Sequence, residues 1–159
     1  MDFIKRFFRN KAVGYYIAIG VFVLAVVTAI VFFSTFENPA FNGPENTPAM
    51  GNKASGLIPI TIGIFLIAGT VIELVVLFAP EFRFFHLAAI IMFGLALYKD
   101  VLIIADFFAY FSTGVLYNGG NVGLNMFFLI AIGIIEIAAI VASFFGFVKE
   151  VDDDEEEDA

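Results

Sequence analysis

The chain lacks cysteine and tryptophan, has a single histidine, and carries a charge at only 15% of its positions. Without cysteine, disulfides, thiol nucleophiles and thiolate metal sites are excluded. One histidine, His86, cannot form a paired-histidine metal motif, and the sequence contains no glycine-rich phosphate loop, HExxH or GxSxG motif. The sequence therefore predicts a non-enzymatic protein with no cofactor and no metal. A membrane enzyme that works with carboxylates alone is an alternative to this prediction.

Apolar residues are abundant instead. Of the 159 residues, 61% are hydrophobic and 22 are phenylalanine, and the mean hydropathy is +0.97. Soluble domains are nearer half apolar and a quarter charged, and a chain of this length cannot bury such an excess in one core. We therefore expect an integral membrane protein whose main partner is the lipid bilayer. With only eight basic residues, the chain is not expected to bind nucleic acid.

Four apolar segments are long enough to cross a bilayer as helices. A hydrocarbon core of about 30 Å requires about 20 helical residues, because lipid cannot satisfy exposed backbone groups. Pro59 falls in the first turn of the second segment and Pro80 lies just beyond its end, and both positions are compatible with a helix. The sequence predicts an all-α membrane protein, a four-transmembrane-helix bundle over residues 12–148, with spans at 12–35, 57–78, 84–113 and 124–148.

The distribution of basic residues predicts the orientation of the bundle. Cytoplasmic loops carry an excess of Lys and Arg. One side of the four spans would carry six basic residues and the other only Lys53; the six are Lys5, Arg6, Arg9, Lys11, Arg83 and Lys149. The expected location is the plasma membrane with both termini in the cytoplasm. The first apolar run is too long for a typical cleaved signal peptide, so we expect it to stay as a helix.

The two ends of the chain differ in charge. Residues 1–11 are basic, which suits contact with anionic lipid beside the first span. Residues 149–159 form an acidic tail that should be disordered, because like charges repel and nothing in it can be buried. The tail is either a solvated end or a contact for a basic cytoplasmic partner.

The two halves of the chain share short matching segments. Phe65-Leu66-Ile67-Ala68 is followed five residues later by Glu73, and Phe128-Leu129-Ile130-Ala131 is followed five residues later by Glu136. In the same way, Phe33-Ser34-Thr35 resembles Phe111-Ser112-Thr113. The pattern predicts a duplicated helical hairpin with both copies in one orientation, an architecture common in membrane proteins. Chance matching between apolar segments is the alternative.

Five Asp, Glu and Lys residues fall inside the predicted spans. Each costs about 2.5–3.5 kcal/mol at the bilayer centre, so such groups usually face the protein interior. Counting inward from the matched outer ends at 1.5 Å per residue places Lys99 about 21 Å deep and Glu136 about 18 Å deep. We expect Lys99 to bridge two glutamates in one polar layer. The predicted intramembrane cluster is Glu73, Lys99, Asp100, Asp106 and Glu136.

Helical spacing assigns these residues to faces that include small residues, which close packing in lipid favours. The expected interior faces are Gly63, Leu66, Gly69 and Glu73; Ala96, Lys99, Asp106 and Tyr110; Gly133, Glu136, Ile140 and Ser143; and a stripe of Gly14, Ala18, Ala25 and Ala29 on the first helix. These small-residue stripes are also candidates for self-association. His86, near the start of the third span, is within possible reach of Glu81 or Glu73.

Two functional interpretations follow from the cluster. The first is a structural one, in which Lys99 neutralises carboxylates and the protein is an accessory or structural membrane subunit, as a homo-oligomer or in a larger complex. The second is a proton- or cation-coupled channel or transporter, in which a glutamate in low-dielectric surroundings holds a proton. The excess of acids over the single lysine favours protonation or a bound cation over simple neutralisation. The structural subunit is the first expectation and transport the alternative.

Overall fold

The computed structural model describes residues 11–36, 59–112 and 122–148, and within these ranges the chain is helical without a β-strand. Residues 1–10 and the acidic tail lie outside this part. Each of the four long helices is apolar and long enough to cross a membrane, as the sequence predicts. In chain order the elements are α2 (Val13–Phe36), α4 (Thr61–Phe78), the short 3-10 helix η2 (Pro80–Phe82), α5 (Phe85–Ser112) and α6 (Val122–Phe145).

Two helix ends differ from the prediction by three residues or more. The second span begins at Thr61 rather than at residue 57, and Pro59 precedes the helix, where its carbonyl accepts a hydrogen bond from the Ile62 N–H at 3.2 Å. The fourth span ends at Phe145 rather than at residue 148. Gly146 there has a φ of 67°, a left-handed conformation that glycine adopts readily and that terminates helices.

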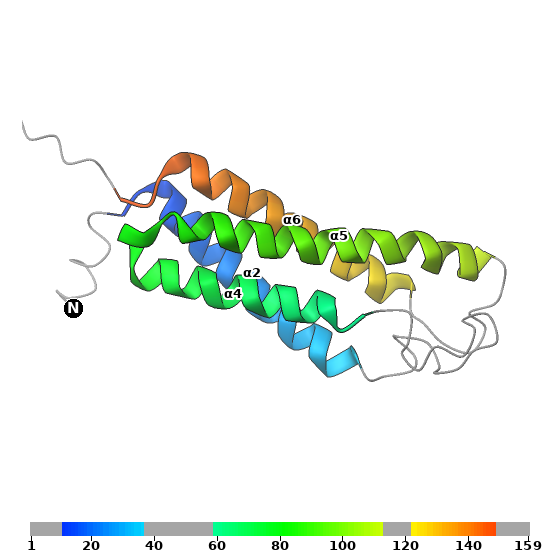
Figure 1. Cartoon of the computed structure of the whole chain (residues 1–159). Coiled ribbons are helices and arrows are strands. Elements are labelled where there is room, and N and C mark those ends of the chain that lie inside the picture. The colour runs from blue at the N-terminus through cyan, green and yellow to red at the C-terminus, as the bar shows by residue number, and fades with distance from the viewer. Residues whose placement is uncertain (1–10, 37–58, 113–121, 149–159) are drawn as a thin grey trace, which may run out of the picture.

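The four helices form a ring in which α2 packs against α4 and α6, and α5 packs against the same two (Figure 1). The diagonal pairs are therefore α2 with α5 and α4 with α6. The matching sequence segments of the two halves lie in these same pairs of helices. The duplication itself stays a prediction.

The first and last described residues meet at one end of the bundle. Lys11 and Val148 pair in an isolated antiparallel bridge, and the Ala12 N–H donates to the Phe147 carbonyl at 3.1 Å. The turn from α4 to α5, which contains η2, lies at this same end (Figure 1). We call it the terminal end. The sequence predicts that both ends of the helical part lie on the same side as the turn that contains Arg83. The structure has this arrangement.

Small residues let the backbones approach closely inside the bundle. A Cβ atom on Gly14 would collide with the carbonyl oxygens of Ala142 and Gly146, so the start of α2 lies directly against the end of α6. The predicted small-residue stripe on α2 is buried, as is the predicted stripe on α4. These stripes are therefore occupied within the chain.

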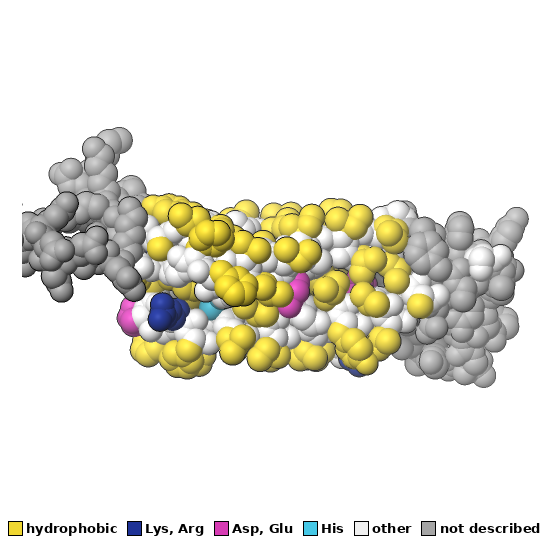
Figure 2. Space-filling view, turned by 90° about the horizontal axis from the view of Figure 1, so that it is seen from above, with side chains coloured by type: hydrophobic (Ala, Val, Ile, Leu, Met, Phe, Trp, Pro, Cys, Tyr) yellow, Lys and Arg dark blue, Asp and Glu magenta, His cyan; other side chains and the backbone are white. Residues whose placement is uncertain are grey.

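The outer surface of the bundle is apolar along its length. Thirty large hydrophobic side chains of the described helices and turns are exposed, among them Phe144 at 82% and Phe78 at 77%. Figure 2 shows the hydrophobic side chains over one face, with an acidic side chain at mid-length and a basic one beside the histidine near the terminal end. Such a surface has no favourable contact with water.

Candidate functional site

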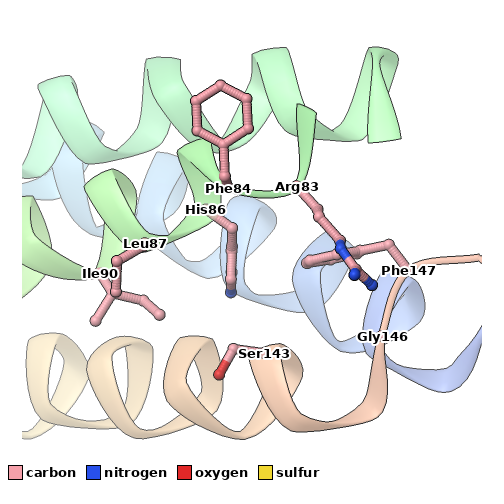
Figure 3. Close-up of a pocket in the computed structure, with 8 residues that line it drawn as sticks. All are labelled: Arg83, Phe84, His86, Leu87, Ile90, Ser143, Gly146 and Phe147. Atoms are coloured by element: carbon pink, nitrogen blue, oxygen red, sulfur yellow. The ribbon is translucent and has the colours of Figure 1, made fainter. Parts of the chain in front are cut away.

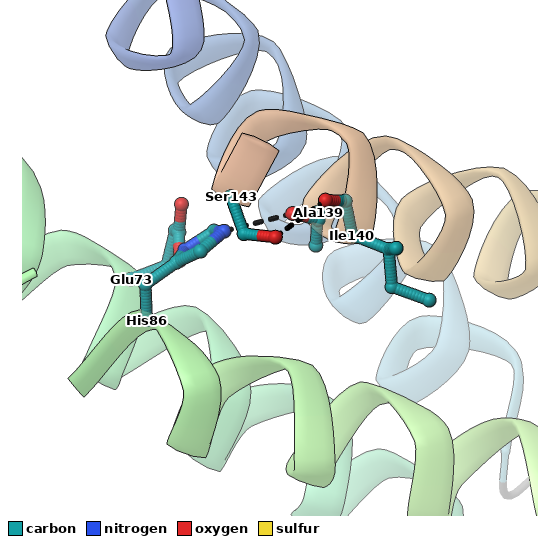
Figure 4. A network of polar contacts seen from close by, with 5 residues as sticks. All are labelled: Glu73, His86, Ala139, Ile140 and Ser143. Atoms are coloured by element: carbon teal, nitrogen blue, oxygen red, sulfur yellow. Dashed lines mark hydrogen bonds and ion pairs between the residues drawn. The ribbon is translucent and has the colours of Figure 1, made fainter. Parts of the chain in front are cut away.

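A buried polar contact joins three helices at His86. Glu73 of α4 is fully buried and His86 of α5 is 1% exposed. The His86 Nδ1 lies 2.7 Å from the Glu73 Oε2, and the Nε2 lies 2.8 Å from the carbonyl oxygen of Ala139 in α6 (Figure 4). The tight turn through Pro80 brings the two side chains together, because it returns the chain at the level of the last turns of α4.

These two contacts fix the number of protons on the pair. A carbonyl oxygen only accepts hydrogen bonds, so the Nε2 of His86 must carry a proton and donate it to Ala139. The 2.7 Å contact on the other side requires a second proton between Nδ1 and the Glu73 carboxyl. The pair is therefore either imidazolium with carboxylate or imidazole with carboxylic acid. Both forms are neutral overall and hold one proton that can be exchanged.

The surroundings of the pair are largely apolar. The Phe147 ring packs edge-on against the His86 ring, with centroids 5.0 Å apart and an interplanar angle of 77°. The other carboxyl oxygen of Glu73, Oε1, is buried and has no hydrogen-bond partner in the described structure. Loss of the shared proton would leave a net negative charge in these surroundings, which is costly.

Glu136 belongs to α6, the helix that also supplies the Ala139 carbonyl to the pair. It precedes Ala139 by three residues, a rise of about 4.5 Å. Its carboxyl group lies against α5 at Gly94, where a Cβ atom would come within 3.2 Å of Oε1. Its Oε2 is buried without a hydrogen-bond partner. Because Gly94 follows His86 by eight residues, about 12 Å of helix, the Glu136 carboxyl group lies further into the bundle than the His86 ring. A common level for Glu73 and Glu136 stays a prediction.

The remaining members of the predicted cluster lie elsewhere. Asp100 is 4% exposed, has a buried Oδ2 without a partner, and follows His86 by fourteen residues, about 21 Å along α5. Lys99 is half-buried and makes no ion pair within the described ranges. The backbone of Asp106 belongs to α5, but its side chain lies outside the described part.

The prediction that Lys99 bridges Glu73 and Glu136 is wrong. Glu73 bonds to His86, which precedes Lys99 by thirteen residues, about 20 Å of helix. The error comes from counting depth from the outer ends of the spans. Because α5 has 28 residues and α4 has 18, the far end of α5 extends well beyond that of α4, and the count places Lys99 at the wrong level.

Two of the predicted interior faces also need correction. On α6, Ile140 and Ser143 are exposed, and the buried residues are Asn125, Phe128, Ala131, Ile132, Ile135, Ala139 and Ala142. On α5 the buried face includes Asp100 rather than Lys99, along with His86, Ala89, Phe93 and Ala96. Spacing alone is ambiguous here, because apolar residues occupy every side of both helices and only neighbouring helices decide which side is internal.

His86 is the main site residue that the sequence left undecided. Its possible reach to Glu73 is confirmed, whereas Glu81 is exposed and forms no ion pair with it. The available signal was the spacing of thirteen residues across a Pro-containing turn, which places two positions at similar levels of an antiparallel hairpin.

A pocket of about 250 Å³ opens beside the pair at the terminal end (Figure 3). We call it the end pocket. It lies between the start of α5 and the end of α6 and is lined by Arg83, Phe84, His86, Leu87, Ile90, Ser143, Gly146 and Phe147. The described residues contain no group of three or more His, Asp or Glu side chains that could hold a metal ion.

Comparison with protein-family models, with curated proteins and with solved structures finds no match to this chain. The geometry of the bundle and its buried polar groups are therefore the basis of the proposed function.

Proposed function

We propose that this protein is a multi-pass membrane protein that takes up protons from the side of its termini and couples them to transport, as a small channel or transporter. The observation that carries the proposal is the two-sided bonding of His86, because the pair with Glu73 must hold an exchangeable proton. Intramembrane ionisable groups that face a protein interior typically mark proton or ion pathways.

Three further features support this proposal over a purely structural role. His86 is among the residues that line the end pocket, and this supports the pocket as the proposed route from water to the pair. The Glu136 carboxyl group lies against Gly94, eight residues beyond His86 in α5, and Asp100 lies deeper still along α5. Both have a buried carboxyl oxygen without a hydrogen-bond partner. A purely structural pair would not require these unpaired carboxyl groups, since each destabilises the fold.

The proposal includes membrane insertion with the terminal end in the cytoplasm. The exposed apolar side chains along the helices support insertion, and Arg83 and Lys11 at the terminal end support this orientation through the positive-inside rule. The chain has no cysteine, so a single introduced cysteine is a unique label. An impermeant thiol reagent outside intact cells should label Thr61→Cys and not Glu81→Cys; the opposite pattern would reverse the orientation.

Proton flux into liposomes tests the activity. Vesicles containing the wild-type protein should dissipate an imposed pH gradient faster than vesicles without protein, and Glu73→Gln and Glu136→Gln should abolish the difference. Glu81→Gln is the matched control, because Glu81 is an exposed carboxylate at the same end. If the wild-type protein gives no flux above empty vesicles, the transport proposal fails.

The second candidate is an accessory or structural membrane subunit. A groove of about 320 Å³ between α2 and α4 favours it, lined by Val26, Ala29, Ile30, Phe33, Ile67, Thr70 and Val71. Six of the seven lining residues are apolar, and the hydroxyl of the seventh, Thr70, donates to the Leu66 carbonyl at 2.7 Å. Absence of flux together with loss of stability in Glu73→Ala would favour this candidate.

A further inference from the structure

The end pocket combines one cation with apolar walls. Arg83 is exposed and belongs to the turn that precedes α5, and Figure 3 shows its side chain reaching across the pocket toward Gly146 and Phe147. No hydrogen bond or ion pair engages its guanidinium within the described part of the chain. The walls are Phe84, Leu87 and Ile90 on one side and the last turn of α6 on the other.

The other polar side chains of the end pocket already form hydrogen bonds within the protein. Both ring nitrogens of His86 are bonded, to Glu73 and to Ala139. The Ser143 hydroxyl donates to the Ile140 carbonyl at 2.6 Å. The unsatisfied recognition element is therefore the guanidinium of Arg83, a group with a planar set of donors that matches phosphate oxygens.

Two apolar residues that line the pocket are largely exposed. Phe84 is 64% exposed and Leu87 is 62% exposed, and both belong to the apolar outer surface next to the opening. A ligand that enters here would keep its charged part against Arg83 and its apolar part against the outer surface of α5. Basic pockets between helices at the cytoplasmic side of a membrane bind anionic lipid headgroups.

We infer that the end pocket binds the phosphate-bearing headgroup of an anionic membrane phospholipid. The inference rests on the membrane insertion proposed above and is independent of proton transport. The headgroup phosphate is held by Arg83, its glycerol part lies between Leu87 and Ser143, and its acyl chains follow the outer surface of α5. Because His86 lines the same pocket, the bound headgroup lies against the ring that shares a proton with Glu73.

Lipid retention by the purified full chain in a neutral detergent tests this inference. Native mass spectrometry should show phosphatidylglycerol retained in preference to phosphatidylcholine. Arg83→Gln should weaken this retention about fivefold to tenfold, the effect of one basic contact. Lys99→Gln is the matched control, since it removes a cation from α5 at a position nine residues, about 14 Å of helix, beyond Ile90, the pocket residue nearest to it along α5. Equal retention by the wild type and Arg83→Gln would overturn the inference.

Two further measurements separate the source of the phosphate and the place of binding. Ser143→Leu fills the pocket and keeps Arg83, so it should also reduce phosphatidylglycerol retention. The 15N signals of His86, the sole histidine, should shift on addition of a short-chain phosphatidylglycerol and not with inorganic phosphate at the same concentration. An equal shift with inorganic phosphate would identify a free-anion site and overturn the lipid assignment. Carbonate extraction of membranes is done first. Release of the protein from the membranes would contradict its insertion, on which the lipid inference rests.

Discussion

Gly94 of α5 lies directly against the carboxyl group of Glu136 in α6, close enough that a Cβ at position 94 would come within 3.2 Å of the glutamate Oε1. The absence of a side chain at Gly94 makes room for a half-buried glutamate, whose Oε2 is buried, between two helices. This contact links a packing position to a group that we place in the proton pathway.

Gly94→Val should therefore disturb Glu136. The added methyl groups must displace the carboxyl group or separate the helices, which should lower the free energy of unfolding by about 1–3 kcal/mol. Proton flux should fall as well. Gly133→Val is the control, because a Cβ there meets no atom within 4 Å. In a double-mutant cycle, Glu136→Ala should relieve part of the Gly94→Val cost, and strict additivity would show that the two positions do not interact.

Glu73→Gln and Glu73→Ala should differ in stability. The Gln amide can donate to the Nδ1 of His86, so both bonds of the ring are kept. The Ala variant leaves that nitrogen buried without a partner, at a cost of about 1–3 kcal/mol. Denaturant or thermal unfolding in detergent measures the difference. Equal stability of the two variants would mean that the contact between Glu73 and His86 is not formed in solution.

Nitrogen-15 NMR of His86 tests the proton count directly. The chain has one histidine, so histidine labelling gives the signals of a single ring. In Glu73→Gln the ring should be neutral with the proton on Nε2, because the Ala139 carbonyl requires a donor and the Gln amide donates to Nδ1. In the wild type Nε2 should be protonated too. A neutral ring with its proton on Nδ1, in either protein, would contradict the structure.

Gly14→Ala should destabilise the bundle at the terminal end. The new methyl group would collide with the carbonyl oxygens of Ala142 and Gly146, which are backbone atoms and cannot rotate away. We expect a loss of about 1–3 kcal/mol in unfolding free energy. Gly20→Ala, on the same helix with open space around it, should be neutral or stabilising, because alanine has the higher helix propensity. A similar effect of both substitutions would argue against close packing of α2 on α6.

Asp100→Leu should stabilise the protein and impair flux. The wild-type carboxyl group is buried with one oxygen unpaired, which costs about 1–3 kcal/mol that an apolar side chain does not incur. If Asp100 belongs to the proton pathway, the more stable variant should conduct less than the wild type. Unfolding in detergent and liposome flux provide the two readouts. A destabilised Asp100→Leu would show that the carboxyl group has a structural partner.

Much of the fold follows from the sequence alone. The four helices are fixed by long apolar runs that water cannot accommodate, and their approximate bounds follow from the prolines, glycines and charges between them. The small-residue stripe from Gly14 to Ala29 and the buried face of α4 with Glu73 are also correctly predicted. These features depend on local composition and on helical spacing, which the sequence contains in full.

The site depended on the tertiary structure. Only the packed bundle shows that Glu73 meets His86 and not Lys99, because the relative level of two helices depends on their lengths and on the turn between them. Only the packed bundle shows that the Ala139 carbonyl of α6 accepts a hydrogen bond from the Nε2 of His86, since no sequence pattern marks a carbonyl oxygen as a partner. The sequence by itself determined that charged groups lie within apolar helices; the packing decided which of them share a proton and which have no partner.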